Sequence, residues 1–101
     1  MIQRKWMIAA TLLISAVAAM AQVKTGIEVL RERNFDVLQG KRVGLCTNPT
    51  GVDRNLVSTI DILWEAENVN LVALYGPEHG VRGNIYAGDH VDNEVDPKTG
   101  L

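Results

Sequence analysis

The sequence predicts an α/β fold built on parallel strands. Two short apolar runs, 42–48 and 69–75, are rich in β-forming residues and are interpreted as strands. A helical pattern separates them, so residues 42–75 have the order and about the length of one βαβ unit. The crossover of such a unit is right-handed, which makes the two strands parallel and neighbours. Both runs are nearly continuous in apolar residues, as in strands that are covered on both faces.

A first helix is expected ahead of this unit, over residues 25–34, TGIEVLRERN. Ile27 and Leu30 lie toward one side of it, with Val29 close by, whereas its charged residues stay in solvent. The chain then turns at Gly40 before the first strand begins.

The helix between the strands has the clearest periodicity in the chain. Apolar residues recur at i, i+1, i+4, i+7 and i+8 and predict one broad face, made of Leu56, Val57, Ile60, Leu63 and Trp64. Asp53, Asn55 and Ser58 are candidates for the N-cap. The helix is expected to end near residues 67–68, with Trp64 in the core.

The first 21 residues have the pattern of a cleavable export signal. Arg4 and Lys5 form a short basic region, the largely apolar run 6–18 follows, and Ala-Met-Ala is a small-x-small cleavage site. The apolar run is shorter than the roughly 20 residues that cross a bilayer. Cleavage after Ala21 leaves residues 22–101 free of the membrane, in the periplasm or outside the cell. The alternative is a retained N-terminal anchor helix.

The remaining 80 residues carry 8 basic and 12 acidic side chains, a net charge of −4. They show no basic stripe and no aromatic platform, which argues against nucleic acid as a partner. Cys46 is the single cysteine, so no intramolecular disulfide can brace the chain. It is expected to be a small buried apolar residue of the first strand rather than a nucleophile. Because so short a chain has a thin stability margin, we expect a fragment of a longer protein.

The stretch LYGPEHGVRG, residues 74–83, places charged side chains directly after the second strand. The loop TNPTG follows the first strand. Because the strands are parallel, both loops leave from the same carboxyl edge of the sheet, where α/β proteins bind ligands. The five polar residues expected to share one cleft there are Asn48, Thr50, Glu78, His79 and Arg82.

Glu78 is the candidate catalytic residue of this edge. A carboxyl group held in a partly dry crevice can act as a general acid near neutral pH. His79 could orient a substrate or tune that proton, and Arg82 could bind a carboxylate. The alternative is structural: Glu78 and Arg82 form a surface ion pair, and His79 only fills the loop.

The loop Asn48-Pro49-Thr50-Gly51 also has two interpretations. Asn48 and Thr50 could donate hydrogen bonds to substrate hydroxyls, or the loop is a helix-entry turn whose polar atoms cap backbone groups. The sequence GLCTNPTG lacks the G-x-G-x-x-G spacing of a dinucleotide site, and no Gly-Lys-Ser/Thr follows it as in a P-loop.

No metal and no cofactor are predicted. His79 and His90 are 11 residues apart in a glycine-rich stretch, without an HExxH or paired-cysteine pattern. The acidic residues of the last segment are instead expected to form a solvated loop; they are Asp89, Asp92, Glu94 and Asp96.

Two blocks of the chain closely resemble the start of the exo-β-N-acetylmuramidases, a family of secreted bacterial glycoside hydrolases. They are LQGKRVGLCTNPTGVDRNLVSTIDIL and VNLVALYGPEHGVRGNIYAGDHVDNEVDPKTGL, and the similarity runs from about Thr25 to Leu101. The resemblance implies a Rossmann-like three-layer domain with a parallel sheet, followed by a smaller domain, with the active cleft between them. Residues 22–101 would be the N-terminal βαβ part of that catalytic domain, truncated.

The resemblance also implies an activity: release of terminal N-acetylmuramic acid from the non-reducing end of peptidoglycan fragments. It assigns the acid/base role to Glu78 and places His79, Arg82 and Asn48 around the sugar. The charge of Arg82 suits the lactyl carboxylate of muramic acid.

Glycoside hydrolysis usually takes two carboxylates, and Asp89 or Asp92 is a poor substitute for the second. The second is therefore expected after Leu101, and the 101-residue chain alone is expected to be inactive. The alternatives are a non-catalytic module that binds cell-wall sugars and a truncated product without function.

Overall fold

The computed structural model describes residues 2–8 and 22–101. Residues 2–8 are helical, and most of the predicted export signal lies outside the described residues. Within the described ranges, no helix is both long enough and apolar enough to cross a membrane.

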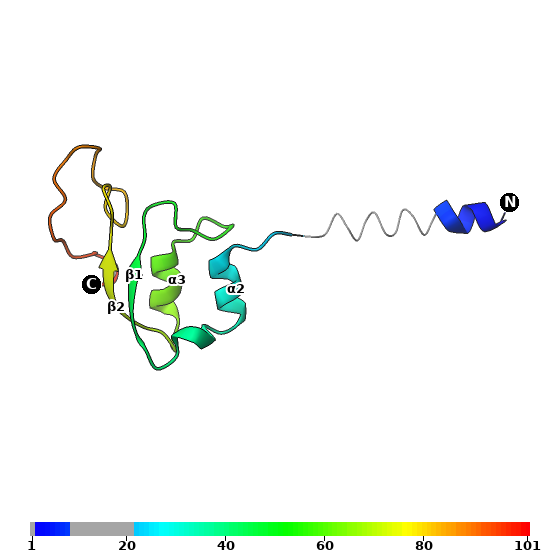
Figure 1. Cartoon of the computed structure of the whole chain (residues 1–101), viewed down its shortest axis with the longest axis horizontal. Coiled ribbons are helices and arrows are strands. Elements are labelled where there is room, and N and C mark those ends of the chain that lie inside the picture. The colour runs from blue at the N-terminus through cyan, green and yellow to red at the C-terminus, as the bar shows by residue number, and fades with distance from the viewer. Residues whose placement is uncertain (1, 9–21) are drawn as a thin grey trace.

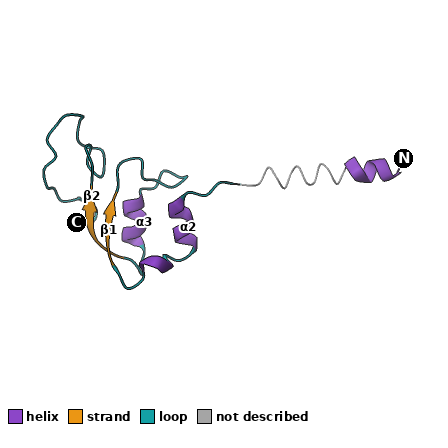
Figure 2. Ribbon diagram, in the orientation of Figure 1, coloured by secondary structure: helices purple, strands orange, loops and turns teal. Residues whose placement is uncertain are grey.

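The centre of the fold is a pair of parallel strands, β1 (Arg42–Cys46) and β2 (Asn70–Tyr75). Helix α3 (Thr59–Glu65) connects them, and both arrowheads point the same way in Figures 1 and 2. The predicted βαβ unit and its parallel, neighbouring strands are therefore confirmed. The register slips between Val43 and Gly44, where β2 contains one additional residue.

Helix α2 (Gly26–Glu32) and α3 lie on the same side of the strands (Figure 1). The core beneath them is formed by Phe35, Ile62, Leu63 and Leu71, with strand residues Val43, Leu45 and Leu74 packed against it. Since side chains alternate along a strand, the neighbours of these residues point to the opposite face. On β1 these neighbours, Arg42, Gly44 and Cys46, are exposed, so among the described residues that face of β1 is open.

Cys46 lies on this open face. It is exposed, and it is paired in register with Tyr75, which is 60% exposed. The prediction that Cys46 is buried was wrong, because the pleat of β1 points Leu45 to the core and the next residue away from it.

Helix α3 begins later than its apolar pattern predicts. Asp53 is buried and its Oδ1 accepts hydrogen bonds from the N–H groups of Asn55 and Val57, which fold this stretch into a turn. Leu56 has a φ of 62°, which an α-helix cannot contain. The helix can start only after this turn. Ser58 is its N-cap and accepts from the N–H of Ile60 at 3.2 Å, which confirms one of the three candidates.

The late start changes which apolar residues are buried. Ile60 and Leu63 face inward as predicted, and Ile62 is buried as well. Trp64 is 42% exposed, so its predicted place in the core was wrong. A helix of only seven residues has one short buried side, and Trp64 lies at its edge.

Helix α2 is shorter than the predicted 25–34. Its first turn is fixed by Glu28, whose carboxylate accepts from the N–H of Thr25 at 2.7 Å and from its hydroxyl at 2.9 Å. Hydrogen bonds from Arg54 and Thr25 lower the pKa of Glu28 to about 2. The chain leaves the helix through Phe35, which is buried at a φ of 52°, and a 3-10 turn at Asp36–Leu38.

The contrast between Leu63 and Leu56 provides a test of this core. Leu63 is 3% exposed and Leu56 is 79% exposed, so the same substitution should cost much more stability at Leu63. Leu63→Ala is expected to lower the free energy of unfolding by about 2–5 kcal/mol, since it removes buried apolar surface and leaves a cavity. Leu56→Ala is expected to change it by less than about 0.5 kcal/mol. Urea unfolding of both variants measures the difference, and equal losses would contradict this core.

Candidate functional site

The loops after β1 and β2 leave the sheet side by side (Figure 1). The N–H of Thr47 donates to the carbonyl of Tyr75 at 3.0 Å, which continues the ladder beyond Cys46. The segments that follow, 48–51 and 76–83, therefore start from neighbouring points at the carboxyl edge. This is the arrangement predicted from the βαβ order.

A pocket of about 450 Å³ lies between the two loops, and we name it the edge pocket. Its lining comprises Asn48, Pro49, Thr50, Pro77, Glu78, His79, Gly83 and Ile85. Four of the five predicted site residues line it, and Arg82 does not. The pocket thus combines one carboxyl group and one imidazole with an apolar wall of two prolines and an isoleucine.

The tip that carries Glu78 and His79 is shaped by short-range hydrogen bonds. The N–H of Gly80 donates to the carbonyl of Pro77 at 3.0 Å and closes a turn around both residues. Nδ1 of His79 lies 3.0 Å from the carbonyl oxygen of Ile85. A carbonyl only accepts, so Nδ1 carries the proton, and Nε2 of the neutral ring is an acceptor.

Asn48 organises the opposite loop. Its Oδ1 accepts from the N–H of Thr50 at 3.1 Å and from the Thr50 hydroxyl at 2.8 Å. This is the backbone-capping turn that was one of the two interpretations of the loop. The Asn48 amide nitrogen makes no hydrogen bond within the described part of the chain, so it remains a donor for a ligand in the pocket.

Gly83 brings the two loops into contact. Its φ is +77°, and a Cβ placed on it would lie 2.6 Å from Cγ of Pro49. Only glycine satisfies both the backbone conformation and this close approach. Both residues of this contact line the edge pocket.

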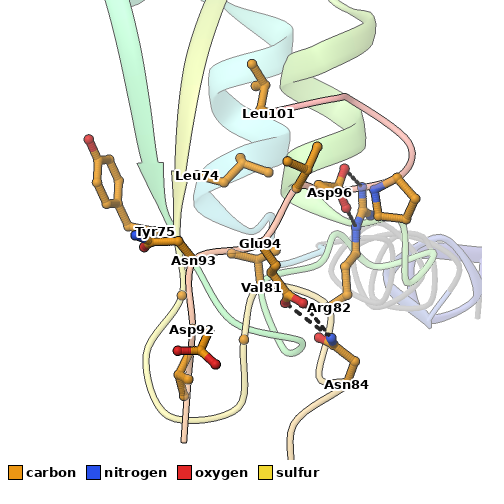
Figure 3. A pocket seen from close by; sticks show the side chains of 15 residues that line it. Leu74, Tyr75, Val81, Arg82, Asn84, Asp92, Asn93, Glu94, Asp96 and Leu101 are labelled. Carbon is orange, nitrogen blue, oxygen red and sulfur yellow. Dashed lines mark hydrogen bonds and ion pairs between the residues drawn. The ribbon is translucent and has the colours of Figure 1, made fainter.

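Arg82 points away from the edge pocket. Its Nε and Nη2 donate to the two carboxylate oxygens of Asp96 at 2.8 and 3.0 Å (Figure 3). Its Nη1 lies 2.9 Å from Oδ1 of Asp61 on α3. The prediction that Arg82 shares a cleft with Asn48 was therefore wrong, and so was the alternative of an ion pair between Glu78 and Arg82. Its role in substrate binding stays a prediction.

Asp96 also differs from its prediction. It is buried rather than solvated, and its Oδ2 accepts from the N–H and the hydroxyl of Thr99 at 3.0 and 2.8 Å. The hydrogen bonds from Arg82 hold the pKa of Asp96 far below its usual range. The signal was available in DPKTG, where Asp followed by Pro and a later Thr-Gly is typical of a side-chain-capped turn. The other acidic residues of the segment are exposed, as predicted: Asp89, Asp92 and Glu94.

Arg82 and Asp96 line a second pocket, of about 540 Å³, between the end of β2 and the segment 91–97 (Figure 3). At its rim Asn84 donates to the carboxylate of Glu94 at 3.2 Å. Among residues 2–8 and 22–101, no three His, Cys, Asp or Glu side chains are grouped so that they could hold a metal ion. His90 instead lies 3.0 Å from Asp92 in solvent.

Together these features define an α/β protein with a carboxyl-bearing pocket at the carboxyl edge of parallel strands. Residues 43–101 match the family model described as exo-β-N-acetylmuramidase NamZ, N-terminal. Because this match covers more than half of the chain, the chain belongs to that muramidase family.

Two relatives support this membership. The chain is 51% identical over 80 residues to the peptidoglycan β-N-acetylmuramidase NamZ of Bacillus subtilis (strain 168), across 79% of this chain and 19% of that protein. The crystal structure of a DUF1343 family protein from Bacteroides fragilis NCTC 9343 is similar with a TM-score of 0.67 and 69% identity, across 77% of this chain and 18% of that one. The chain thus spans about a fifth of the length of these relatives.

The contact between Gly83 and Pro49 provides a test of the edge pocket. Gly83→Ala and Gly88→Ala both place a side chain at positive φ, which costs about 1–2 kcal/mol. A Cβ on Gly88 meets nothing within 4 Å, whereas a Cβ on Gly83 collides with Pro49. We expect Gly83→Ala to lose more stability and to shift the NMR signals of Asn48 and Thr50. Equal behaviour of the two variants would contradict the contact.

The carboxylate of Asp96 provides a test by pH. Its folded-state pKa is lowered, so its stabilising contribution is present above the unfolded value of about 3.9 and is lost as pH falls below that. Asp96→Asn is expected to be less stable than the wild type at pH 7, with a difference that shrinks below about pH 4. Urea unfolding from pH 7 to pH 2 measures it. The exposed Asp89→Asn is the matched control, and a difference independent of pH would contradict the assignment.

Proposed function

We propose that this chain forms the N-terminal part of the catalytic domain of an exo-acting muramidase. The enzyme would release terminal N-acetylmuramic acid from the non-reducing end of peptidoglycan fragments. The observation that carries the proposal is the position of Glu78 in the edge pocket of a chain that belongs to this family. The relative in Bacillus subtilis is a peptidoglycan β-N-acetylmuramidase, which supports the substrate class.

Glu78 is proposed as the general acid and base. In glycoside hydrolysis an acid protonates the oxygen of the leaving group, while a second carboxylate activates water or forms a covalent intermediate. Within the described residues, the edge pocket contains one carboxylate. We therefore propose that the second comes from the remainder of a family-length protein and that this chain alone does not turn over substrate.

The other pocket residues are proposed to bind the sugar. Nε2 of His79 can accept a hydrogen bond from a hydroxyl, because Nδ1 is held by Ile85. The amide nitrogen of Asn48, which makes no hydrogen bond within the described residues, can donate one from the opposite loop. Pro49 and Pro77 supply apolar surface for the carbon face of a sugar ring.

A second candidate is a non-catalytic module that binds cell-wall sugars through the same pocket. The observation that favours it is the single carboxylate in the edge pocket, since hydrolysis usually takes two. Turnover distinguishes the two proposals, because an enzyme hydrolyses the substrate whereas a binding module only binds it.

We also propose export, because the basic and apolar pattern of the first 21 residues is that of a cleaved signal. Peptidoglycan lies outside the cytoplasm, so the location agrees with the substrate class. N-terminal sequencing of the protein recovered from the periplasm or medium would begin at Gln22. Recovery of an uncleaved chain would support the retained anchor helix instead.

Substitution of Glu78 tests the catalytic proposal. In a family-length protein that carries this sequence, Glu78→Gln should reduce release of free N-acetylmuramic acid from a muramic acid–glucosamine disaccharide by about 10²–10⁴-fold, because proton transfer is lost. Binding of the disaccharide, measured by calorimetry, should persist. Glu67→Gln is the matched control, since Glu67 is an exposed carboxylate beyond the end of α3.

Each result separates the candidates. No release by the folded wild type would leave the sugar-binding module as the better proposal. Equal release by the wild type and Glu78→Gln would keep the enzyme and remove Glu78 from the acid/base role.

A further inference from the structure

Two carboxylates from distant parts of the chain converge on one guanidinium. Asp61 belongs to α3, Asp96 belongs to the last turn of the chain, and Arg82 lies between them. All three nitrogens of the guanidinium are engaged: Nε and Nη2 by Asp96, and Nη1 by Asp61. The side chain of Asp96 is 2% exposed and that of Arg82 28%. Paired contacts of this kind fix the direction of an arginine as well as its position.

The two carboxylates are themselves held in place. Asp96 accepts from Thr99, its N–H donates to the carbonyl of Leu101 at 2.7 Å, and its carbonyl accepts from Gly100 at 2.8 Å. Nζ of Lys98 lies 2.9 Å from Oδ2 of Asp61 and so connects the same turn to α3. Arg82 is thus connected both to α3 and to the hydrogen-bonded turn at residues 96–101.

The residue after Arg82 is Gly83, which rests against Pro49 without room for a Cβ. The segment Arg82–Gly83 is therefore held at two points. The side chain of Arg82 is bound to α3, and the backbone of Gly83 contacts the Asn48–Thr50 loop. The turn that carries Glu78 and His79 ends at Gly80, two residues before Arg82. A shift of Arg82 would therefore move two neighbouring parts of the edge pocket: Gly83, which rests against Pro49, and the turn that carries Glu78 and His79.

We propose that Arg82 is a positioning residue: clamped by Asp96 and Asp61, it holds Gly83 against Pro49 and fixes the distance between Glu78 and the Asn48–Thr50 loop. Arg82 touches no ligand in this role, and it acts through the backbone of its own loop. The catalytic consequence rests on the proposed function of Glu78, whereas the mechanical consequence does not.

Arg82→Met tests the catalytic consequence in a family-length protein. It keeps a long side chain but removes the charge, so the buried Asp96 loses its counterion, Asp61 keeps only Lys98, and the loop is no longer clamped. A misplacement of about 1 Å can cost roughly 10²-fold in rate, so we expect a fall of that order in kcat, with a smaller change in KM. Arg82→Lys retains the positive charge but lacks the planar guanidinium group, so it should recover part of the lost kcat.

A matched ion pair elsewhere separates positioning from general stability. Arg31 pairs with Asp53 at 3.0 Å, and that carboxylate is also buried, at 1% exposure. Arg31→Met breaks a comparable pair between α2 and the turn at Asp53. Within the described residues, neither partner forms a hydrogen bond or ion pair with Arg82, Gly83 or the turn that carries Glu78. It should reduce stability and leave kcat near the wild-type value. Equal losses of kcat in the two variants would overturn the proposal.

Hydrogen exchange tests the mechanical consequence without any activity. The N–H groups of Gly80 and Ile85 donate within the loop, to Pro77 and His79. Their exchange should become faster in Arg82→Met and stay unchanged in Arg31→Met. Unchanged exchange in folded Arg82→Met would overturn the proposal, even if the wild type shows no muramidase activity and the proposed function fails.

If Arg82→Met does not fold, Asp61→Asn serves in its place. It removes one of the two carboxylate charges and leaves the paired contacts with Asp96 intact. An intermediate fall in kcat and an intermediate rise in exchange at Gly80 and Ile85 are expected. The absence of both would overturn the proposal.

Discussion

The backbone ladder between β1 and β2 is the interaction on which the remaining structure depends. It aligns two strands whose paired residues are 28 or 29 positions apart in the sequence and makes them end at the same edge. The polar residues that follow the two strands therefore lie at the same edge of the sheet. The ladder alone is sufficient to bring the two loops of the edge pocket together. The core under α2 and α3 supports the ladder from one face only, so the position of the loops depends strongly on contacts made beyond the strands.

Acidic residues in this chain are used in two ways. Asp53 and Asp96 are buried, accept several hydrogen bonds each and organise turns, with one arginine as partner in each case. Glu78 is exposed in a pocket and makes no hydrogen bond or ion pair within the described ranges. A carboxylate that already has strong partners holds its charge firmly and is suited to structure, whereas an unoccupied one can exchange a proton with a substrate.

The elements and their order followed from local sequence, because strand composition and helical periodicity are properties of consecutive residues. The shared edge also followed, since it needs only the parallel order. The partners of Arg82 did not, because Asp61 and Asp96 lie 21 and 14 residues from it and meet it only through the fold. The late start of α3 was equally hidden: it depends on Asp53 forming a buried turn and on Leu56 adopting a left-handed conformation. Trp64 was misplaced for the same reason, since a shorter helix buries fewer positions.

The single cysteine of the chain lies on the open face of β1, one residue before Thr47, whose N–H extends the ladder toward the edge pocket. Because this thiol is exposed in the folded protein, it is accessible to a maleimide. The molecule therefore has a native attachment point for a fluorophore or spin label close to its pocket but outside the lining. No engineered cysteine has to be introduced, and every label in the sample reports from the same site.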